Sequence, residues 1–314
     1  MIAAVYGAFF HVLSEENQIL LAKPIGKLRV KKKETRHSIC IGDEVEYRLN
    51  SQQDSTDIQA VITNVLPRKN FVGRSDLYKT QVLASNVDLV AVVLSLFHPT
   101  ANFGFLDRVL AECEMRNIEA IIIINKYDLL KDKKISVLIS DKYLDELNNR
   151  IKEYKQLKYE VLLTSFVEAI SNKLYNKISG KTVLLTGLSG VGKSTFLNKF
   201  AGKKIQQVDE DIIKFKGRHI TTNPVLYVSS DNTRLIDTPG LREFGLYHWT
   251  PLELQNGFVE LHGIQCQFND CLHVNAPNCG IKESKISQKR YDSYCSILNA
   301  LKEKYKPRRG NSYR

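Results

Sequence analysis

The stretch "GLSGVGKS", residues 187–194, combines glycines, a lysine and a hydroxyl at a spacing that binds phosphate. It fits the pattern G-x4-G-K-S, follows an expected strand and opens an expected helix, which is the context that the motif requires. Glycines let backbone N–H groups close around phosphate oxygens, and the helix N-terminus adds positive field. We expect Lys193 to bridge the outer phosphates and Ser194 to ligate Mg²⁺. The predicted nucleotide-binding residues of this stretch are Gly187, Leu188, Ser189, Gly190, Val191, Gly192, Lys193, Ser194 and Thr195.

A second motif, "DTPG", residues 237–240, ends an expected strand downstream of this loop. An aspartate at a strand end in that position can hold Mg²⁺ through a water molecule. We therefore predict that Asp237 serves the magnesium ion and that the backbone N–H of Gly240 faces the γ-phosphate. D-x-x-G alone is a weak signal, but behind a phosphate loop it favours a nucleoside triphosphate site.

The base is predicted to be read by "INKYD", residues 124–128, which ends an expected strand of isoleucines. Guanine presents two N–H donors on one edge, and the carboxylate of Asp128 can accept both, whereas adenine would leave one oxygen unpaired. Asn125 would brace the loop and the base, and the stem of Lys126 would cover the ring. Thr164 and Ser165, in "TSF" at the end of the next strand, are expected to present backbone N–H to the guanine oxygen. The alternative interpretation of "NKYD" is a solvated turn.

The order of these motifs is unusual, because the base motif precedes the phosphate loop along the chain. All the pieces lie at the carboxyl ends of expected strands, which is the edge where ligands bind in parallel sheets. Linear order therefore matters little if those strands lie side by side. The sequence predicts a circularly permuted GTPase.

The stretch "GRHITT", residues 217–222, lies between the phosphate loop and "DTPG". Either Thr221 or Thr222 could complete the Mg²⁺ shell. Leu241 stands where many small GTPases place a water-orienting glutamine, and an apolar side chain cannot orient water. His219 is the nearest candidate for catalytic help, the alternative being a solvent-facing loop histidine.

A cluster of soft metal ligands follows in "CQFNDCLHVNAPNC", with the pattern C-x4-C-x-H-x5-C. Turn-forming residues between the ligands allow them to close one tetrahedral Zn²⁺ site, and no position for a catalytic water is implied. We therefore predict one structural zinc ion. Disulfides are the alternative, disfavoured by a reducing cytosol and by the interleaved histidine. The predicted ligands are Cys266, Cys271, His273 and Cys279.

The distribution of polar and apolar residues predicts three parts. Residues 1–66 show short strands, expected at 2–12, 18–22, 36–41, 43–49 and 57–66, as in a small oligonucleotide-binding (OB) β-barrel. Residues 67–250 alternate apolar strands with helices, the pattern of a mostly parallel α/β sheet. Residues 251–314 hold the Cys/His cluster and a basic helix expected over 283–305.

The net charge of +11 is concentrated in two clusters. Residues 23–36 carry seven Lys/Arg against one Asp/Glu, and residues 280–314 carry ten against three. Such clusters favour a polyanionic partner, with nucleic acid first, over two solvated lysine-rich surfaces. No stretch is apolar enough for a membrane span and no signal peptide is expected, so the sequence predicts a cytoplasmic protein without a membrane partner.

The combination of basic barrel, permuted GTPase motifs and C-x4-C-x-H-x5-C closely resembles the bacterial ribosome small-subunit-dependent GTPase A family. "IGDEV", "LASNVDLV", "FLDRVL" and "LREFGL" resemble that family too, so the likeness covers nearly the whole chain. The resemblance implies a late-stage assembly factor of the small ribosomal subunit, which binds ribosomal RNA and hydrolyses GTP to GDP when stimulated by the subunit. His219 matches the catalytic loop histidine of the family, and Ile220 departs from its usual threonine.

Two functions follow from these motifs. In the first, turnover of GTP releases an assembly factor from the subunit. In the second, GTP sets the affinity of an RNA-binding module and its hydrolysis is incidental. We expect a monomer in either case.

Overall fold

The computed structural model describes residues 1–26, 39–50, 58–201, 205–206, 224–238 and 243–304. Contacts divide the chain into two compact units. The first comprises residues 1–73, 82–102 and 118–242, and the second comprises residues 74–81, 103–117 and 243–314. Among the helices in the described ranges, none has both the length and the apolar character that a membrane crossing needs.

The N-terminal strands of the first unit pair in the order β1-β2-β3-β5-β4. Sequence predicted one strand from Ile2 to Val12, and this was wrong. Gly7 has a φ of +61°, so the chain turns there and returns as an antiparallel partner. Of the strand predicted over 36–41, the described residues 39–41 are not in a strand. The strands are β1 Ile2–Tyr6, β2 Phe9–Leu13, β3 Ile19–Pro24, β4 Val45–Leu49 and β5 Ala60–Val65.

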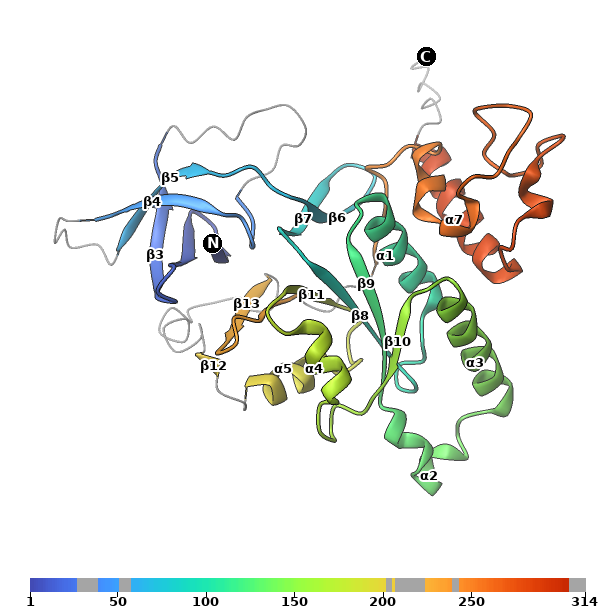
Figure 1. Cartoon of the computed structure of the whole chain (residues 1–314), viewed down its shortest axis with the longest axis horizontal. Helices are drawn as coiled ribbons and strands as arrows, with labels where there is room; N and C mark the ends of the chain where they lie inside the picture. The colour runs from blue at the N-terminus through green and yellow to red at the C-terminus, as the bar shows by residue number, and fades with distance from the viewer. Residues whose placement is uncertain (27–38, 51–57, 202–204, 207–223, 239–242, 305–314) are drawn as a thin grey trace, which may run out of the picture. The chain divides into compact units, whose positions relative to one another are not determined.

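The central sheet has the strand order β10-β9-β8-β11-β14-β13, followed by β1. Strands β10, β9, β8, β11 and β13 are labelled in Figure 1. The pairs from β10 to β14 are all parallel, and β13 is antiparallel to β14. The predicted mostly parallel sheet is therefore confirmed. Its strands are β8 Leu89–Ser95, β9 Glu119–Asn125, β10 Glu160–Leu163, β11 Thr182–Thr186, β13 Val225–Ser229 and β14 Arg234–Asp237, with the short β12 Ile205–Gln206 paired to β13.

Both faces of the sheet are buried, which explains the continuous apolar runs in the sequence. On one face, alternate residues such as Leu89, Ala91 and Val93 of β8 form a core cluster. Residues of α4 (Asn172–Ile178) and α5 (Lys193–Ala201) complete that cluster, among them Leu174 and Phe196. The strand ends are thereby held at fixed positions, side by side.

Two helices of the first unit, α3 and α4, begin after serine caps. The backbone N–H of Tyr143 donates to the Ser140 hydroxyl at the start of α3 (Asp141–Gln156). Sequence predicted the next helix from Val167, but α4 begins only after its cap, Ser171, whose hydroxyl accepts from Leu174 N–H. The short helices η1 Tyr127–Leu130 and α2 Lys133–Ser136 lie between β9 and α3.

Sequence missed one hairpin, formed by β6 (Phe71–Ser75) and β7 (Thr80–Ser85) as a separate two-stranded sheet. Its strands are short, and the turn between them contains the exposed Leu77 and Tyr78, so the sequence shows no clear polar break there. The tip, residues 74–81, belongs to the second unit.

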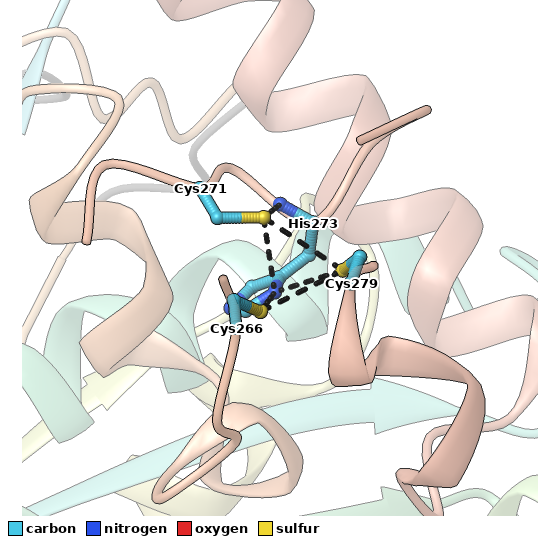
Figure 2. A group of neighbouring side chains, drawn as sticks. All are labelled: Cys266, Cys271, His273 and Cys279. Atoms are coloured by element: carbon cyan, nitrogen blue, oxygen red, sulfur yellow. Dashed lines mark hydrogen bonds between the residues drawn. The ribbon is translucent and has the colours of Figure 1, made fainter. Parts of the chain in front are cut away.

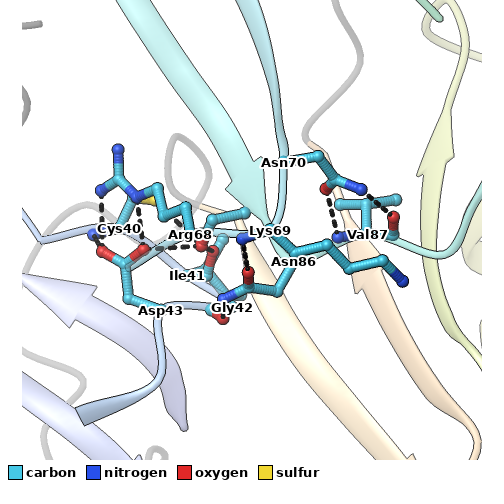
Figure 3. A network of polar contacts seen from close by, with 10 residues as sticks. Cys40, Ile41, Gly42, Asp43, Arg68, Lys69, Asn70, Asn86 and Val87 are labelled. Carbon is cyan, nitrogen blue, oxygen red and sulfur yellow. Dashed lines mark hydrogen bonds and ion pairs between the residues drawn. The ribbon is translucent and has the colours of Figure 1, made fainter. Parts of the chain in front are cut away.

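A buried carboxylate, that of Asp43, joins the N-terminal strands to the segment that leads into the central sheet (Figure 3). Asp43 is fully buried. It accepts from the guanidinium of Arg68 at 2.6 and 2.8 Å, from the Ser85 hydroxyl at 2.7 Å and from Cys40 N–H at 2.9 Å. Four donors satisfy a charge that would otherwise be costly to bury.

The second unit contains α1 (Phe103–Met115) and the C-terminal region. Arg290 of α7 is fully buried and donates to Asp107 of α1 and to Glu260, both at 2.7 Å. Sequence predicted this last helix over 283–305, and it begins later. The other helices of the second unit among the described residues are η2 Glu253–Gly257, η3 Val259–Leu261, η4 Gly280–Glu283 and α7 Gln288–Lys304.

We predict that Asp43→Ala lowers the free energy of unfolding by about 3–5 kcal/mol, because it removes the buried acceptor of four hydrogen bonds, two of them from the Arg68 guanidinium. The control is Lys69→Ala, at the residue that follows Arg68. It removes an exposed ion pair between Lys69 and Asp88. That loss should be below about 1 kcal/mol. Urea denaturation followed by circular dichroism measures both, and equal losses would contradict the role given to Asp43.

Candidate functional site

The phosphate-binding motif lies between the end of β11 and the first turn of α5. Gly192 has a φ of +103°, and a Cβ there would lie 2.2 Å from Nδ2 of Asn125. Gly187 has a φ of +151°, and a Cβ there would lie 2.3 Å from the carbonyl oxygen of Val93. Both positions therefore require glycine, and the loop is held tightly against the ends of β8 and β9.

The side chain of Asn125, at the end of β9, joins the base motif to the phosphate loop. Asn125 is 2% exposed. Its Nδ2 donates to the carbonyl oxygen of Val191 at 2.7 Å, and its Oδ1 accepts from Phe166 N–H at 2.8 Å. One buried amide thus connects three segments that sequence predicted to meet, those following β9, β10 and β11.

The other residues of the base motif lie beside "TSF". Tyr127 N–H donates to the carbonyl oxygen of Thr164 at 3.1 Å. Thr164 and Ser165 are both buried. Oδ1 of Asp128 and Oγ of Ser165 are buried and have no hydrogen-bond partner among the described residues. Two polar atoms without partners, one in η1 after β9 and one just after β10, therefore remain for a ligand.

Lys193 and Asp237 form the charged part of the site. Nζ of Lys193 donates to the carbonyl oxygens of Gly187 at 2.8 Å and Leu188 at 3.1 Å. Burial lowers the pKa of Lys193, while Asp237 acts in the opposite direction. Burial raises the pKa of Asp237 to about 6, against the opposing effect of Lys193. Oδ1 of Asp237 has no hydrogen-bond partner within the described ranges, so a cation beside it would favour the charged carboxylate.

The remaining residues of the predicted nucleotide site differ in their exposure and in whether the structure describes them. Ser189, Gly190 and Ser194 are exposed, and Thr195 is half-buried in the first turn of α5. The predicted residues His219, Thr221, Thr222 and Gly240 lie outside the described residues.

The Cys/His cluster lies in the second unit, with its four side chains pointing toward one another (Figure 2). The four ligand atoms all lie within 4.8 Å of one another. Sγ of Cys279 lies 3.8 Å from Sγ of Cys266 and 3.7 Å from Sγ of Cys271. Nδ1 of His273 lies 3.4 Å from the sulfurs of Cys266 and Cys279.

These distances fit a metal ion with tetrahedral coordination. Metal–sulfur bonds of about 2.3 Å at tetrahedral angles place two sulfurs about 3.8 Å apart, and a sulfur–nitrogen pair slightly closer. All four side chains therefore fit around one metal ion. The same sulfurs are too far apart for a disulfide, and the cysteines are free.

The model of a known GTPase family matches residues 65–247 of the chain, and that family is described as RsgA GTPase. The "Small ribosomal subunit biogenesis GTPase RsgA" of Flavobacterium johnsoniae is 32% identical over 313 residues, covering 96% of this chain and 92% of the relative. The chain belongs to the RsgA GTPase family. The resemblance inferred from the motifs is confirmed.

Solved structures agree with this membership in the RsgA family. The crystal structure of YjeQ from Thermotoga maritima is 28% identical with a TM-score of 0.71, and the match covers 96% of this chain and 97% of that one. YloQ, described as a circularly permuted GTPase, is 24% identical with a TM-score of 0.68 over 98% and 95% of the two chains, and shows the fold alone. The predicted fold class is confirmed.

Sequence reasoning missed one segment beside this candidate site, residues 96–101, which follow β8. The ammonium of Lys126 donates to the carbonyl oxygen of His98. The segment follows the carboxyl end of β8, which pairs with β9. Its position at this edge of the sheet, where ligands bind, was the signal that could have found it. Its side chains are of types that carry no phosphate or base motif.

We predict that the purified chain holds one metal ion in the cluster and that Cys271→Ser loses it, because three ligands bind a soft divalent ion far more weakly than four. Cys295→Ser is the matched control, since Cys295 is a free cysteine of α7 outside the cluster. Elemental analysis by inductively coupled plasma mass spectrometry measures both. Retention of the full metal content by Cys271→Ser would contradict the prediction.

Proposed function

We propose that this chain is a GTP hydrolase that acts in biogenesis of the small ribosomal subunit. Relatives that cover most of the chain carry that function in their names. The observation that carries the proposal is the Asn125 side chain, which bonds to the phosphate loop and to the "TSF" segment at once. A base-reading motif and a phosphate motif are thus parts of one site, as a nucleotide requires.

In this proposal guanine lies over the end of β9. The carboxylate of Asp128 accepts the two N–H donors of the base, and the buried Oδ1 without a partner in the described structure supports this role. The stem of Lys126 covers the ring. The backbone N–H of Thr164 donates to the carbonyl oxygen of Ile124 at 2.9 Å, so the predicted role of that N–H at the guanine oxygen is wrong. The backbone N–H of Ser165 is proposed to face the guanine oxygen, and the segment is held next to Asn125 by the bond from Phe166 N–H.

The phosphates lie in the loop of residues 187–195. Lys193 would exchange its bonds to backbone carbonyl oxygens for bonds to the outer phosphates, which the partly desolvated ammonium favours. Ser194 and either Thr221 or Thr222 would hold Mg²⁺, with Asp237 acting through water. The ion would neutralise charge that develops on the phosphates. Gly240 would donate its N–H to the γ-phosphate.

Catalysis in this proposal depends on His219. An apolar residue, Leu241, follows "DTPG", so the attacking water needs another group to orient it. Water attacks the γ-phosphorus, the bond to the β–γ bridging oxygen breaks, and GDP and phosphate leave. His219 would orient that water after the subunit has bound.

The proposed partners are the small ribosomal subunit and its RNA. Basic clusters at residues 23–36 and 280–314 supply the positive charge that ribosomal RNA attracts. We propose three domains, namely an OB-type barrel (1–66), a GTPase domain (67–250) and a zinc domain (251–314). Zinc is the proposed ion of the Cys/His cluster, because three thiolates and an imidazole suit it. The protein is proposed to act in the cytoplasm as a monomer.

Asp128→Asn tests the guanine assignment. We expect GTP to bind at least about 100-fold more weakly, because one charged acceptor of two N–H donors is lost. Xanthosine triphosphate should gain affinity, since an amide N–H can donate to its additional carbonyl. Asp132→Asn, the same change at an exposed helix cap four residues away, should alter neither affinity. Unchanged GTP binding by Asp128→Asn, measured with fluorescent nucleotides, would remove the guanine assignment.

His219→Ala tests whether turnover is the function. Wild-type GTP hydrolysis should rise when purified small ribosomal subunits are added. The variant should bind GTP normally but lose about 100-fold or more of the stimulated rate, as removal of a group acting on water does. Full stimulation in the variant would favour the RNA-binding module with incidental hydrolysis.

A further inference from the structure

Residues 96–101 form a short segment that begins at the base motif. β8 and β9 pair in register as far as Ser95 and Asn125. One residue later, Leu96 N–H donates to the carbonyl oxygen of Asn125 at 2.9 Å. The segment therefore starts from the backbone of the residue that connects the base and phosphate motifs.

The phenol of Tyr143, in the first turn of α3, closes this segment at both ends. Its hydroxyl donates to the carbonyl oxygen of Leu96 at 2.8 Å and accepts from Ala101 N–H at 3.0 Å. From the end of β8, the Ser95 hydroxyl donates to the carbonyl oxygen of Pro99 within the segment. Burial raises the pKa of Tyr143, which keeps the hydroxyl protonated and able to donate.

The middle of the segment meets two parts of the nucleotide site. The carbonyl oxygen of His98 accepts from the ammonium of Lys126. Cδ of Pro99 lies 3.5 Å from the position that a Cβ on Gly190 would occupy, so it packs beside the phosphate loop. The Lys126 ammonium is thereby bonded to the middle of a segment whose two ends are joined by the Tyr143 hydroxyl.

We propose that Tyr143 is a positioning residue for guanine nucleotide binding, acting through residues 96–101 on Lys126. This inference rests on the proposed function, because it takes the Lys126 stem as the cover of the base. The base is common to GDP and GTP, so positioning of Lys126 changes the affinity for both alike. It leaves the transfer of the γ-phosphoryl group to other residues.

The test is Tyr143→Phe, which removes only the hydroxyl. We expect the Kd of both GDP and GTP to rise about three- to ten-fold, because the variant loses the hydrogen bonds of the Tyr143 hydroxyl that hold the segment in contact with Lys126. KM for GTP should rise by the same factor, and kcat should change less than twofold. The control is Tyr154→Phe on the same helix, whose buried hydroxyl accepts a hydrogen bond from the Arg150 guanidinium. It should leave both constants unchanged.

A double-mutant cycle with Lys126→Met separates positioning from a general effect on the fold. Lys126→Met keeps the apolar stem and removes the ammonium that His98 holds. If Tyr143 acts through Lys126, Tyr143→Phe should have no further effect on Kd in that background. An equal loss in both backgrounds, or an unchanged Kd in the single variant, would overturn the inference.

Two further measurements keep the result interpretable. Should Tyr143→Phe fail to fold, Ser95→Ala loosens the same segment from its other side and must give the same pattern of Kd and kcat. Wild-type affinity for GDP and ADP is measured first. Equal affinity for the two would remove the proposed function itself, whereas guanine preference without an effect of Tyr143 would remove only this inference.

Discussion

The hydrogen bonds of one buried carboxamide, that of Asn125, are the interaction on which the nucleotide site depends. A buried amide must satisfy its donor and its acceptor, and here the donor goes to Val191 and the acceptor to Phe166. The two partners lie 66 and 41 residues away along the chain. The bonds are made at the carboxyl ends of parallel strands of one sheet, so their geometry does not depend on the order in which those strands occur along the chain. A circular permutation can therefore leave such a site intact.

Around this fixed point the protein keeps several polar atoms without partners in the described structure. Asp128, Ser165 and Asp237 each bury an oxygen in this way. Each buried polar atom without a hydrogen bond destabilises a fold by about 1–3 kcal/mol, so such atoms are rare at positions that serve only packing. Their concentration at one sheet edge, next to Lys193, is what a site prepared for a polar, charged ligand requires. Asp43 is the contrasting case, because its carboxylate is fully satisfied and serves only to connect segments of the chain.

The second unit is organised by its own buried polar groups. Arg290 is fully buried between Asp107 and Glu260, and its guanidinium lies 4.5 Å from the centre of the Phe258 ring. The backbone that carries the Cys/His cluster is also supported from α7, where the hydroxyls of Tyr291 and Tyr294 donate to the carbonyl oxygens of His273 and Leu272. These tyrosines thus act in packing and in orienting ligand-bearing backbone.

The sequence by itself determined the motifs, because phosphate, guanine and soft-metal chemistry each demand particular residue types at short spacings, as in residues 187–194 and 266–279. It also determined the parallel sheet, because strands buried on both faces must be continuously apolar. Only the tertiary structure decided that Ile2–Leu13 is a hairpin, that α1 belongs with the C-terminal region, and that Tyr143 reaches the segment beside Lys126. Each of these depends on contacts between segments distant in sequence, or on one glycine's φ angle, and neither leaves a periodic pattern in the chain.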